Sequence, residues 1–389
     1  MSTADHISTS LSEGFDFYPT TRVLFGNGVL HRLSDCLEAN WEKVLLVTDP
    51  GIVAAGHARI VEDLLRGVGR TVCTFDSVFE NPTTTLVDAG VAFARETAIP
   101  DVIIALGGGS AMDTAKGINF LLSNGGQMRD YWGVGKAHLP MLPSVGIPTT
   151  AGTGSEAQSF ALISDAQTHQ KMACGDVKAR FTRVLLDPNL LLTVPRSVAA
   201  VTGIDALSHA LESYVCTRSN AVSRLFSREA WRLLAVHFPE VLADPNNLDA
   251  WGKMMVGANF AGMAIENAML GAAHAAANPL TARLDIVHGQ AVGVMLPHVV
   301  VCNWEVAGDG YRELMNLAGI PGESASDLAD FLTGLCEKAG LKVNLSSLGV
   351  DESLLMPLAG EAAQQWTANF NPRAMNAGDF ENLYRSAWS

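Results

Sequence analysis

Residues 101–116, DVIIALGGGSAMDTAK, contain the pattern that decides the fold. The apolar run Asp101–Leu106 predicts a buried strand, three glycines follow it, and the residues after Ser110 have helical character. Glycines let backbone N–H groups approach a ligand closely, and the N-terminus of the next helix attracts a phosphate. The stretch therefore predicts a strand, a phosphate-binding turn and a helix. A Gly triplet can also simply close a turn, and this motif is not GxGxxG.

Short β-branched runs alternate with helical stretches through the first half of the chain. Further strands are predicted at Lys43–Val47, Thr71–Phe75 and Ser144–Ile147. Continuous apolar runs of this kind are typical of strands that are covered on both faces. The first half therefore predicts a parallel sheet between helices, which is the α/β fold class.

The second half of the chain is rich in Ala, Leu and Met at helical spacing. Helical segments are predicted at Val198–Tyr214, Ser223–Phe238, Ala250–Ala277 and Ala325–Ala339. Because two prolines bracket a short apolar stretch where the pattern changes, we place a domain boundary there. The predicted organisation is a flexible tail over 1–14, an α/β domain over 15–190 and an all-α domain over 191–389.

Composition and charge exclude several classes of protein. The chain has 389 residues, of which 48% are apolar and 17% charged, as in a well-folded protein with a substantial core. Its 40 acidic residues exceed its 26 basic residues, which gives a net charge of −14 and disfavours nucleic acid as a partner. The six cysteines are scattered without a CxxC pair, as expected where thiols stay reduced.

Membrane association is not expected from the apolar patterning. The first fourteen residues have no apolar core, and the longest apolar candidate, residues 291–301, is interrupted by Pro297 and His298. We therefore expect a cytoplasmic protein.

Two further segments beside predicted strand ends favour a nucleotide site. Asp49 follows the strand at 43–47, where a carboxylate can accept hydrogen bonds from a ribose diol and repel a 2′-phosphate. An Asp that only initiates a turn before Pro50 is the alternative. The segment 148–156, PTTAGTGSE, places four hydroxyl groups after the strand at 144–147, which suits contacts to phosphates and a nicotinamide amide.

Four residues of the second half have the composition of a metal site. Asp205 and His209 are four residues apart in a helical stretch, so their side chains share one face within roughly 6 Å. His274 lies in an Ala-rich helical segment, and His288 precedes Gly289 after a break that contains Pro279. A lone buried His is usually structural, but one carboxylate with three imidazoles suits Fe²⁺, Zn²⁺ or Mn²⁺. An open coordination position for a substrate oxygen would make the site catalytic.

Six other histidines have no acidic or histidine partner at ligand spacing. We expect them to be structural or exposed: His6, His31, His57, His138, His169 and His237.

Together these motifs resemble those of the iron-containing (group III) alcohol dehydrogenases, from Phe15 over nearly the whole chain. The matching segments are FGNG at 25–28, TD at 48–49, GGGS at 107–110 with Asp113, PTTAGT at 148–153, TGIDALSHALE at 202–212 and NPR at 371–373. The resemblance implies a Rossmann-like domain followed by an all-helical domain, the dehydroquinate synthase-like architecture, with the site in the cleft. It also implies a homodimer or a larger homo-oligomer.

The resemblance further implies which residues form the site. It assigns the metal to Asp205, His209, His274 and His288. It assigns NAD(H) to Asp49, Gly108, Gly109, Ser110, Thr149, Thr150, Thr153 and Lys171. It maps a substrate pocket onto Phe160, Ile265, Asn278, Trp366 and Thr367. Asn278 stands where the family often carries a further His, which bears on proton transfer and substrate preference and not on metal binding.

The sequence therefore predicts a metal-dependent, NAD(H)-linked alcohol dehydrogenase or aldehyde reductase. Small primary alcohols or diols are the expected substrates, because a mostly apolar pocket offers few partners for a carboxylate or phosphate. A hydroxyacid-oxoacid transhydrogenase or a 4-hydroxybutyrate-type hydroxyacid dehydrogenase is the alternative, with Arg283 and Arg373 as candidate carboxylate partners. A dehydroquinate synthase-like lyase would need more Lys and Arg near the ligands, and the metal-free maleylacetate reductases lack the Asp/His set.

Overall fold

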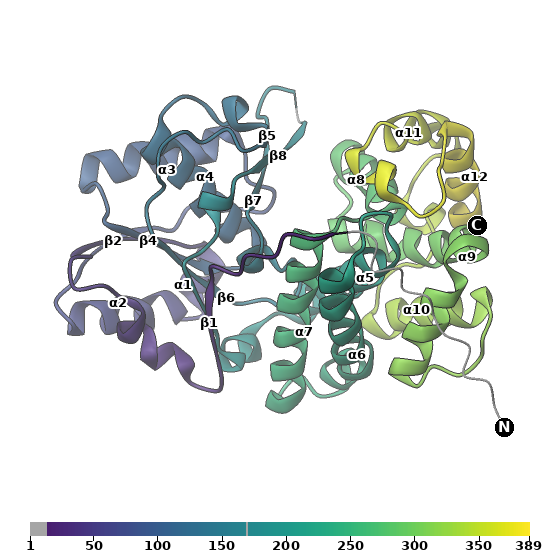
Figure 1. Ribbon diagram of the computed structural model, residues 1–389, viewed down its shortest axis with the longest axis horizontal. Helices are drawn as coiled ribbons and strands as arrows, with labels where there is room; N and C mark the ends of the chain where they lie inside the picture. The colour runs from purple at the N-terminus through teal and green to yellow at the C-terminus, as the bar shows by residue number, and fades with distance from the viewer. Residues whose placement is uncertain (1–13, 169) are drawn as a thin grey trace.

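The computed structural model describes residues 14–168 and 170–389, which form an α/β part followed by a helical part (Figure 1). This arrangement confirms the predicted fold class. The tail predicted over 1–14 falls outside the described residues except for Gly14, and so do His6 and His169.

A six-stranded parallel sheet forms the centre of the α/β part, with the strand order β1-β9-β6-β4-β2-β3. All four predicted strands belong to it, whereas the two strands at 22–25 and 183–186 were not predicted. The strands are β1 (Arg22–Phe25), β2 (Lys43–Val47), β3 (Thr71–Phe75), β4 (Val102–Gly107), β6 (Ser144–Pro148) and β9 (Arg183–Leu186).

Helices cover both faces of this sheet (Figure 1). Alternate residues of β4 belong to two separate apolar clusters, Ile103 to the first and Val102 and Ile104 to the second. Because successive side chains of a strand point to opposite faces, one strand supplies both clusters. The covering helices are α1 (Pro50–Ala54), α2 (His57–Gly67), α3 (Thr84–Thr97) and α4 (Gly109–Asn124).

A small second sheet, not predicted from the sequence, packs beside α4 with the order β5-β8-β7. Strands β7 (Phe160–Ser164) and β8 (Lys171–Gly175) are antiparallel, and β5 (Gly133–Val134) pairs with β8. The sheet carries Phe160 and Lys171, which are two of the predicted site residues.

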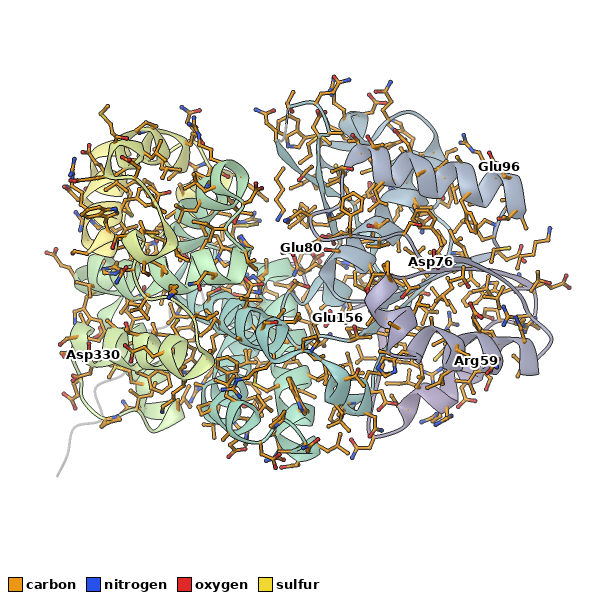
Figure 2. The ribbon with its side chains drawn as sticks, turned by 180° about the vertical axis from the view of Figure 1, so that it is seen from behind. Arg59, Asp76, Glu80, Glu96, Glu156 and Asp330 are labelled. Atoms are coloured by element: carbon orange, nitrogen blue, oxygen red, sulfur yellow. The ribbon has the colours of Figure 1, made fainter. Side chains whose placement is uncertain are left out.

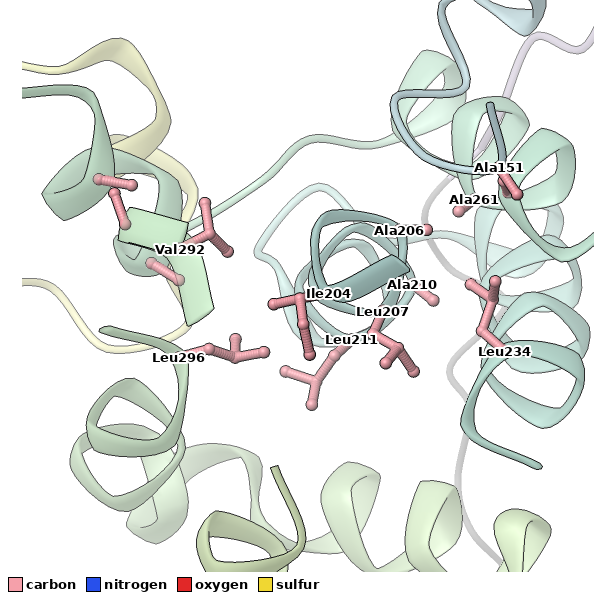
Figure 3. Packing of buried hydrophobic residues seen from close by; sticks show 14 of the residues in the cluster. Ala151, Ile204, Ala206, Leu207, Ala210, Leu211, Leu234, Ala261, Val292 and Leu296 are labelled. Atoms are coloured by element: carbon pink, nitrogen blue, oxygen red, sulfur yellow. The ribbon is translucent and has the colours of Figure 1, made fainter. Parts of the chain in front are cut away.

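The helical part is built around α5, whose residues between Ala199 and Tyr214 are largely buried. Figure 3 shows its side chains enclosed by neighbouring helices: Ile204 lies near Val292 and Leu296 of α9, and Ala210 faces the side of Leu234. The helices are α5 (Arg196–Val215), α6 (Ala221–Ala243), α7 (Leu248–Asn267), α8 (Ala272–Leu284), α9 (His288–Ala318), α10 (Ala325–Ala339), α11 (Leu355–Ala362) and α12 (Ala377–Trp388).

Two sequence expectations about these helices were wrong. The segment Ala250–Ala277 is two helices, because the chain leaves helical geometry at Ala268 and re-enters it after Gly271. Pro279 lies inside α8, so the break before His288 falls at residues 285–287.

Helix α9 continues through Pro297 for 31 residues and is apolar enough to cross a membrane on length and composition alone. Most of its apolar window is buried inside the protein, where it packs against α5, α8 and α10. In this fold α9 is therefore a core helix of the helical part.

A stripe on α7 joins the helical part to the loop between β6 and β7. Asn259 donates to the buried Glu156 carboxylate at 2.9 Å, and Figure 2 places Glu156 at the junction of the two parts. One turn later the backbone of Gly262 lies directly against Gly154. At the end of the stripe, the Glu266 carboxylate accepts from the Ser159 backbone N–H at 2.9 Å.

We predict that Gly262→Ala lowers the thermal unfolding midpoint. A Cβ at this position would lie 2.4 Å from the Gly154 carbonyl oxygen, so the loop or the helix must shift, at a cost of about 1–3 kcal/mol. Gly334→Ala is the matched control, because a Cβ there meets nothing within 4 Å and removing a helical glycine should leave stability unchanged or raise it. Equal midpoints for the two variants would contradict the close contact.

Candidate active site

The structure brings the four predicted metal ligands together at the centre of the helical part. Asp205 and His209 project from α5, His274 from α8, and His288 is the first residue of α9. The Nε2 atoms of His209, His274 and His288 lie 3.5, 3.6 and 3.8 Å from Asp205 Oδ1. Asp205, His209 and His274 each offer a ligand atom within 4.8 Å of the others.

The donor atoms of this cluster fit a divalent cation. Asp205 Oδ1 and His274 Nε2 are buried and have no hydrogen-bond partner among residues 14–168 and 170–389. Buried polar atoms without partners cost free energy, so a group of them facing one another indicates a bound ion. One carboxylate oxygen and three imidazole nitrogens are a donor set for Fe²⁺, Zn²⁺ or Mn²⁺.

Electrostatics in the cluster also suits a cation. Burial disfavours the charged carboxylate of Asp205, but the surrounding imidazoles outweigh this effect and hold its pKa well below the usual range. Burial lowers the pKa of His209 to about 4 and that of His288 to about 3, so both are neutral with a free lone pair at neutral pH. Burial opposes a charge on His274 too, yet the nearby Asp205 carboxylate and the hydrogen-bonded Glu212 carboxylate raise its pKa to about 9. A bound cation would replace the proton on His274.

Gly289 explains how His288 reaches the cluster. A Cβ at position 289 would lie 2.1 Å from the Val201 carbonyl oxygen of α5, so only glycine allows the start of α9 to approach α5 this closely. His288 thereby comes within reach of Asp205, although the two are far apart in sequence.

The glycine turn after β4 forms a cradle at the start of α4. Gly108 is the N-cap residue of the helix, and Gly109 and Ser110 form its first turn. A Cβ at Gly109 would lie 2.7 Å from the Thr153 side chain, and one at Gly108 would lie 3.3 Å from Thr150 Oγ1. The turn and the Thr-rich loop therefore pack together, as a shared dinucleotide site requires.

Thr149 anchors that loop to the cradle, because its backbone N–H donates to the Gly107 carbonyl at 3.0 Å. Strand β6, which leads into the loop, is the immediate neighbour of β4 in the sheet. The strand order therefore places the two segments side by side.

Asp49 sits at the carboxyl end of β2, the neighbour of β4 on its other side. Its Oδ1 caps α1 by accepting from the Ile52 backbone N–H at 3.0 Å. Its Oδ2 lies 3.2 Å from the position of a Cβ at Gly107, so this oxygen faces the cradle. The capping contact of Oδ1 therefore leaves Oδ2 available for the predicted contact with a ribose.

Lys171 is exposed at the start of β8. Burial is the main cause of the lowered pKa of His288, and the positive charge of Lys171 adds to it.

The predicted substrate-pocket residues come from four different elements. Phe160 of β7 stacks at a tilt on Trp366, with ring centroids 6.2 Å apart. Asn278 on α8 donates to Gln365 Oε1 at 3.1 Å. Ile265 on α7 is buried, and the Thr367 hydroxyl is buried without a partner in the described part of the chain.

The two arginines considered for a carboxylate substrate are already engaged. Arg283 pairs with Glu361, and Arg373 lies 3.5 Å from Asp379 and donates to the Cys302 carbonyl. Both side chains are about half exposed.

Of the six histidines expected to be structural or exposed, four lie in the described residues and are so, although His237 has an acidic partner three residues on, which the spacing argument missed. His31 and His138 are exposed, and His237 pairs with Glu240 at 2.8 Å. His57 is buried and bonded to Thr193 Oγ1 at 2.7 Å.

Glu212 was not predicted as a site residue, although it contacts the cluster. Its buried carboxylate lies 2.6 Å from His274 Nδ1. The available signal was its spacing, because Asp205, His209 and Glu212 follow one another at four and three residues on one helical face.

Comparison with known proteins identifies relatives over almost the full length. Residues 19–188 match the family described as iron-containing alcohol dehydrogenase, and residues 199–388 match the C-terminal part of the Fe-containing alcohol dehydrogenase family. The NAD-dependent methanol dehydrogenase of Bacillus methanolicus is 31% identical, over 95% of this chain and 99% of the relative. The 1,3-propanediol dehydrogenase of Klebsiella pneumoniae is 33% identical, over 96% and 99%. The crystal structure of a 1,3-propanediol oxidoreductase is similar with a TM-score of 0.92 at 32% identity, over 97% of this chain and 100% of that one.

We predict that Asp205→Asn loses metal. The amide keeps the volume but removes the negative charge that the three imidazoles face, so the site should not retain a cation through dialysis. Elemental analysis of protein loaded with Zn²⁺ and then dialysed measures this, with about one equivalent expected for the unaltered chain. His57→Gln, a buried histidine outside the cluster, serves as the control and should keep its metal. Full metal content in Asp205→Asn would refute the assignment.

Proposed function

The chain belongs to the iron-containing alcohol dehydrogenase family, and on that premise we propose that it is a metal-dependent, NAD(H)-linked alcohol dehydrogenase and aldehyde reductase. It transfers a hydride between nicotinamide and small primary alcohols or diols, or the corresponding aldehydes. Fe²⁺ is the proposed metal, and Zn²⁺ or Mn²⁺ suits the same donor set.

One contact carries the proposal: the Thr-rich loop of the cradle lies directly on α5. A Cβ at Gly152 would come 2.5 Å from the Thr202 Cβ, one turn before Asp205. The same loop presents Thr150 and Thr153 to the glycine turn. A dinucleotide bound in the cradle and a substrate bound at the cluster would therefore meet across this loop.

The residues of the chain then have distinct tasks. Asp205, His209, His274 and His288 would hold the metal, which supplies a Lewis acid for the substrate oxygen. Gly108, Gly109 and Ser110 would bind the pyrophosphate through backbone N–H groups at the start of α4. Asn278 is paired with Gln365, and neither amide titrates near neutral pH, so proton exchange would run through water or the cofactor ribose.

The substrate class follows from the pocket residues. Phe160, Ile265 and Trp366 would bury a short carbon chain, while Asn278 and Thr367 offer uncharged hydrogen-bonding groups. Relatives named for methanol and 1,3-propanediol support this choice. Arg283 and Arg373 are each paired with a carboxylate, so neither is the free cation for which the hydroxyacid alternatives considered them.

We also propose that the enzyme acts in the cytoplasm as a homodimer or larger homo-oligomer. All six cysteines are free thiols, which agrees with a reducing compartment.

A substrate screen of the metal-loaded protein tests the proposed class. We expect kcat/KM for uncharged alcohols, diols and aldehydes to exceed that for hydroxyacids of the same chain length, because burying an unpaired carboxylate is costly. Pairs such as 1,4-butanediol and 4-hydroxybutyrate isolate the effect of the charge. Much faster turnover of the hydroxyacids would favour the transhydrogenase or hydroxyacid dehydrogenase alternative.

Asp49→Asn tests the cofactor preference. Asparagine can still cap α1, but it lacks the charge that repels a 2′-phosphate, so the preference for NAD(H) over NADP(H) should narrow by about tenfold or more. Steady-state kinetics with both cofactors measures the ratio. Asp187→Asn is the control, because it changes another capping carboxylate on the α/β part and should leave the ratio as it is. An unaltered enzyme that uses both cofactors equally would overturn the role of Asp49.

A further inference from the structure

The two ring nitrogens of His274 face two different carboxylates, and among the residues that the structure describes only Nδ1 is hydrogen-bonded. Its Nε2 points toward Asp205 Oδ1 at 3.6 Å, while its Nδ1 lies 2.6 Å from Glu212 Oε2. Glu212 is only 2% exposed. The Nδ1 atoms of His209 and His288 have no hydrogen-bonded side chain within the described ranges, so His274 alone among these three is fixed by a carboxylate.

This contact selects the form of His274 that can bind a metal. An ionised carboxylate can only accept a hydrogen bond, so the proton of a neutral His274 must reside on Nδ1. The lone pair is then on Nε2, the nitrogen that faces Asp205. The opposite tautomer would turn an N–H toward the cluster and could not bind a cation.

Glu212 also fixes the position of the helix that carries His274. Its second oxygen, Oε1, accepts from the Ala273 backbone N–H at 2.7 Å, in the first turn of α8. Backbone N–H groups at a helix start lack partners within the helix and carry partial positive charge, so a carboxylate is favoured there. One side chain of α5 therefore holds both the imidazole and the start of its helix.

Gly271 leaves the space for this carboxylate. A Cβ at that position would lie 3.0 Å from Glu212 Oε1 and 3.0 Å from Asn371 Oδ1. Asn371 caps the same helix by accepting from the Ala272 backbone N–H at 3.2 Å, and it bonds to Asn303 without a hydrogen bond to His274. The chain thus offers two buried caps on one helix start, of which Glu212 is the one bonded to His274.

We propose that Glu212 is a positioning residue of the metal centre, which selects the tautomer of His274 and orients its ring toward the cation. The inference rests on the metal binding stated under the proposed function. Glu212 itself does not touch the metal or the substrate. Its contribution is a higher affinity for the metal and a defined geometry around it.

Glu212→Gln tests this with little change in volume. The glutamine carbonyl can accept from only one of the two N–H groups, and its NH₂ favours the His274 tautomer with the proton on Nε2. We expect the Kd for Zn²⁺ alone to increase 10- to 100-fold, as measured by competition with a chromophoric chelator. The visible spectrum of the Co²⁺-loaded protein should shift as well, because it reports ligand geometry.

Asn371→Ala is the matched control, since it removes a cap from the same helix without removing a bond to His274. It should lower the thermal unfolding midpoint of the metal-free protein but keep the Kd for Zn²⁺ within about twofold of the starting value. Equal Kd changes in Glu212→Gln and Asn371→Ala would show that Glu212 only holds the helix, and would overturn the proposal.

Glu212→Asp keeps the charge on a shorter side chain and should recover part of the lost affinity. If Glu212→Gln does not fold, the Kd for Zn²⁺ of Glu212→Asp is compared with that of Asn371→Ala instead. A normal Zn²⁺ Kd and Co²⁺ spectrum in both Glu212 variants would overturn this inference alone. Failure of the unaltered chain to bind any divalent cation would instead overturn the proposed metal centre, and this inference with it.

Discussion

Close approach of three neighbouring segments to one stretch of α5 is the constraint on which the rest of the structure depends. At consecutive positions of this helix, Gly289 packs on the Val201 carbonyl, Gly152 packs on Thr202, and Gly203 makes room for the Phe238 ring. In each case a Cβ would come within about 2.5 Å of its neighbour, so a larger residue would push the segment away. One turn further along lies Asp205. Gly152 and Gly289 therefore bring the Thr-rich loop and the start of α9 close to Asp205.

This arrangement places polar groups inside a helical core, which must be compensated. Asp205, His209 and Glu212 are each no more than 6% exposed, yet they lie on a helix that is buried on nearly all sides (Figure 3). Burying such groups is costly unless each charge has a partner. Glu212 meets this requirement with two N–H donors, whereas Asp205 Oδ1 has none in the described part of the protein. Glu212 is thus a carboxylate with its hydrogen bonds satisfied, whereas the described residues leave Asp205 Oδ1 free for the cation that we propose.

The sequence predicts a feature of the fold or the site when a local residue pattern determines it, and fails when packing between distant segments does. Strands such as β2 and β4 are continuous apolar runs, and their local pattern was sufficient. The strand β1 is only four residues long and has no such run. The break between α7 and α8 has no local signal either, because an Ala-rich stretch is equally compatible with one helix or two. The pairing of Asp205 with His209 follows from helical spacing, but their meeting with His274 and His288 depends on long-range packing. For those two residues the family resemblance carried the prediction.

The hydroxyl groups of the loop between β6 and β7 led to the prediction that it contacts a nucleotide. The structure shows that this loop also connects α4 to α7. Lys116 of α4 is buried and donates to the Ser155 and Phe160 carbonyls at 2.7 and 2.8 Å. On its other side the loop is held by α7, through Glu156 and the backbone at Gly154.

The helix of the cofactor cradle and the helical part are thus joined through one short segment. Glu266 strengthens the joint, because it also pairs with Arg180 at 2.5 Å in a largely buried position. A motion that separated the two parts at this loop would have to break buried hydrogen bonds and expose charged groups, which is costly. The contacts on both sides of this loop therefore oppose a separation of the glycine turn from Asp205 of α5.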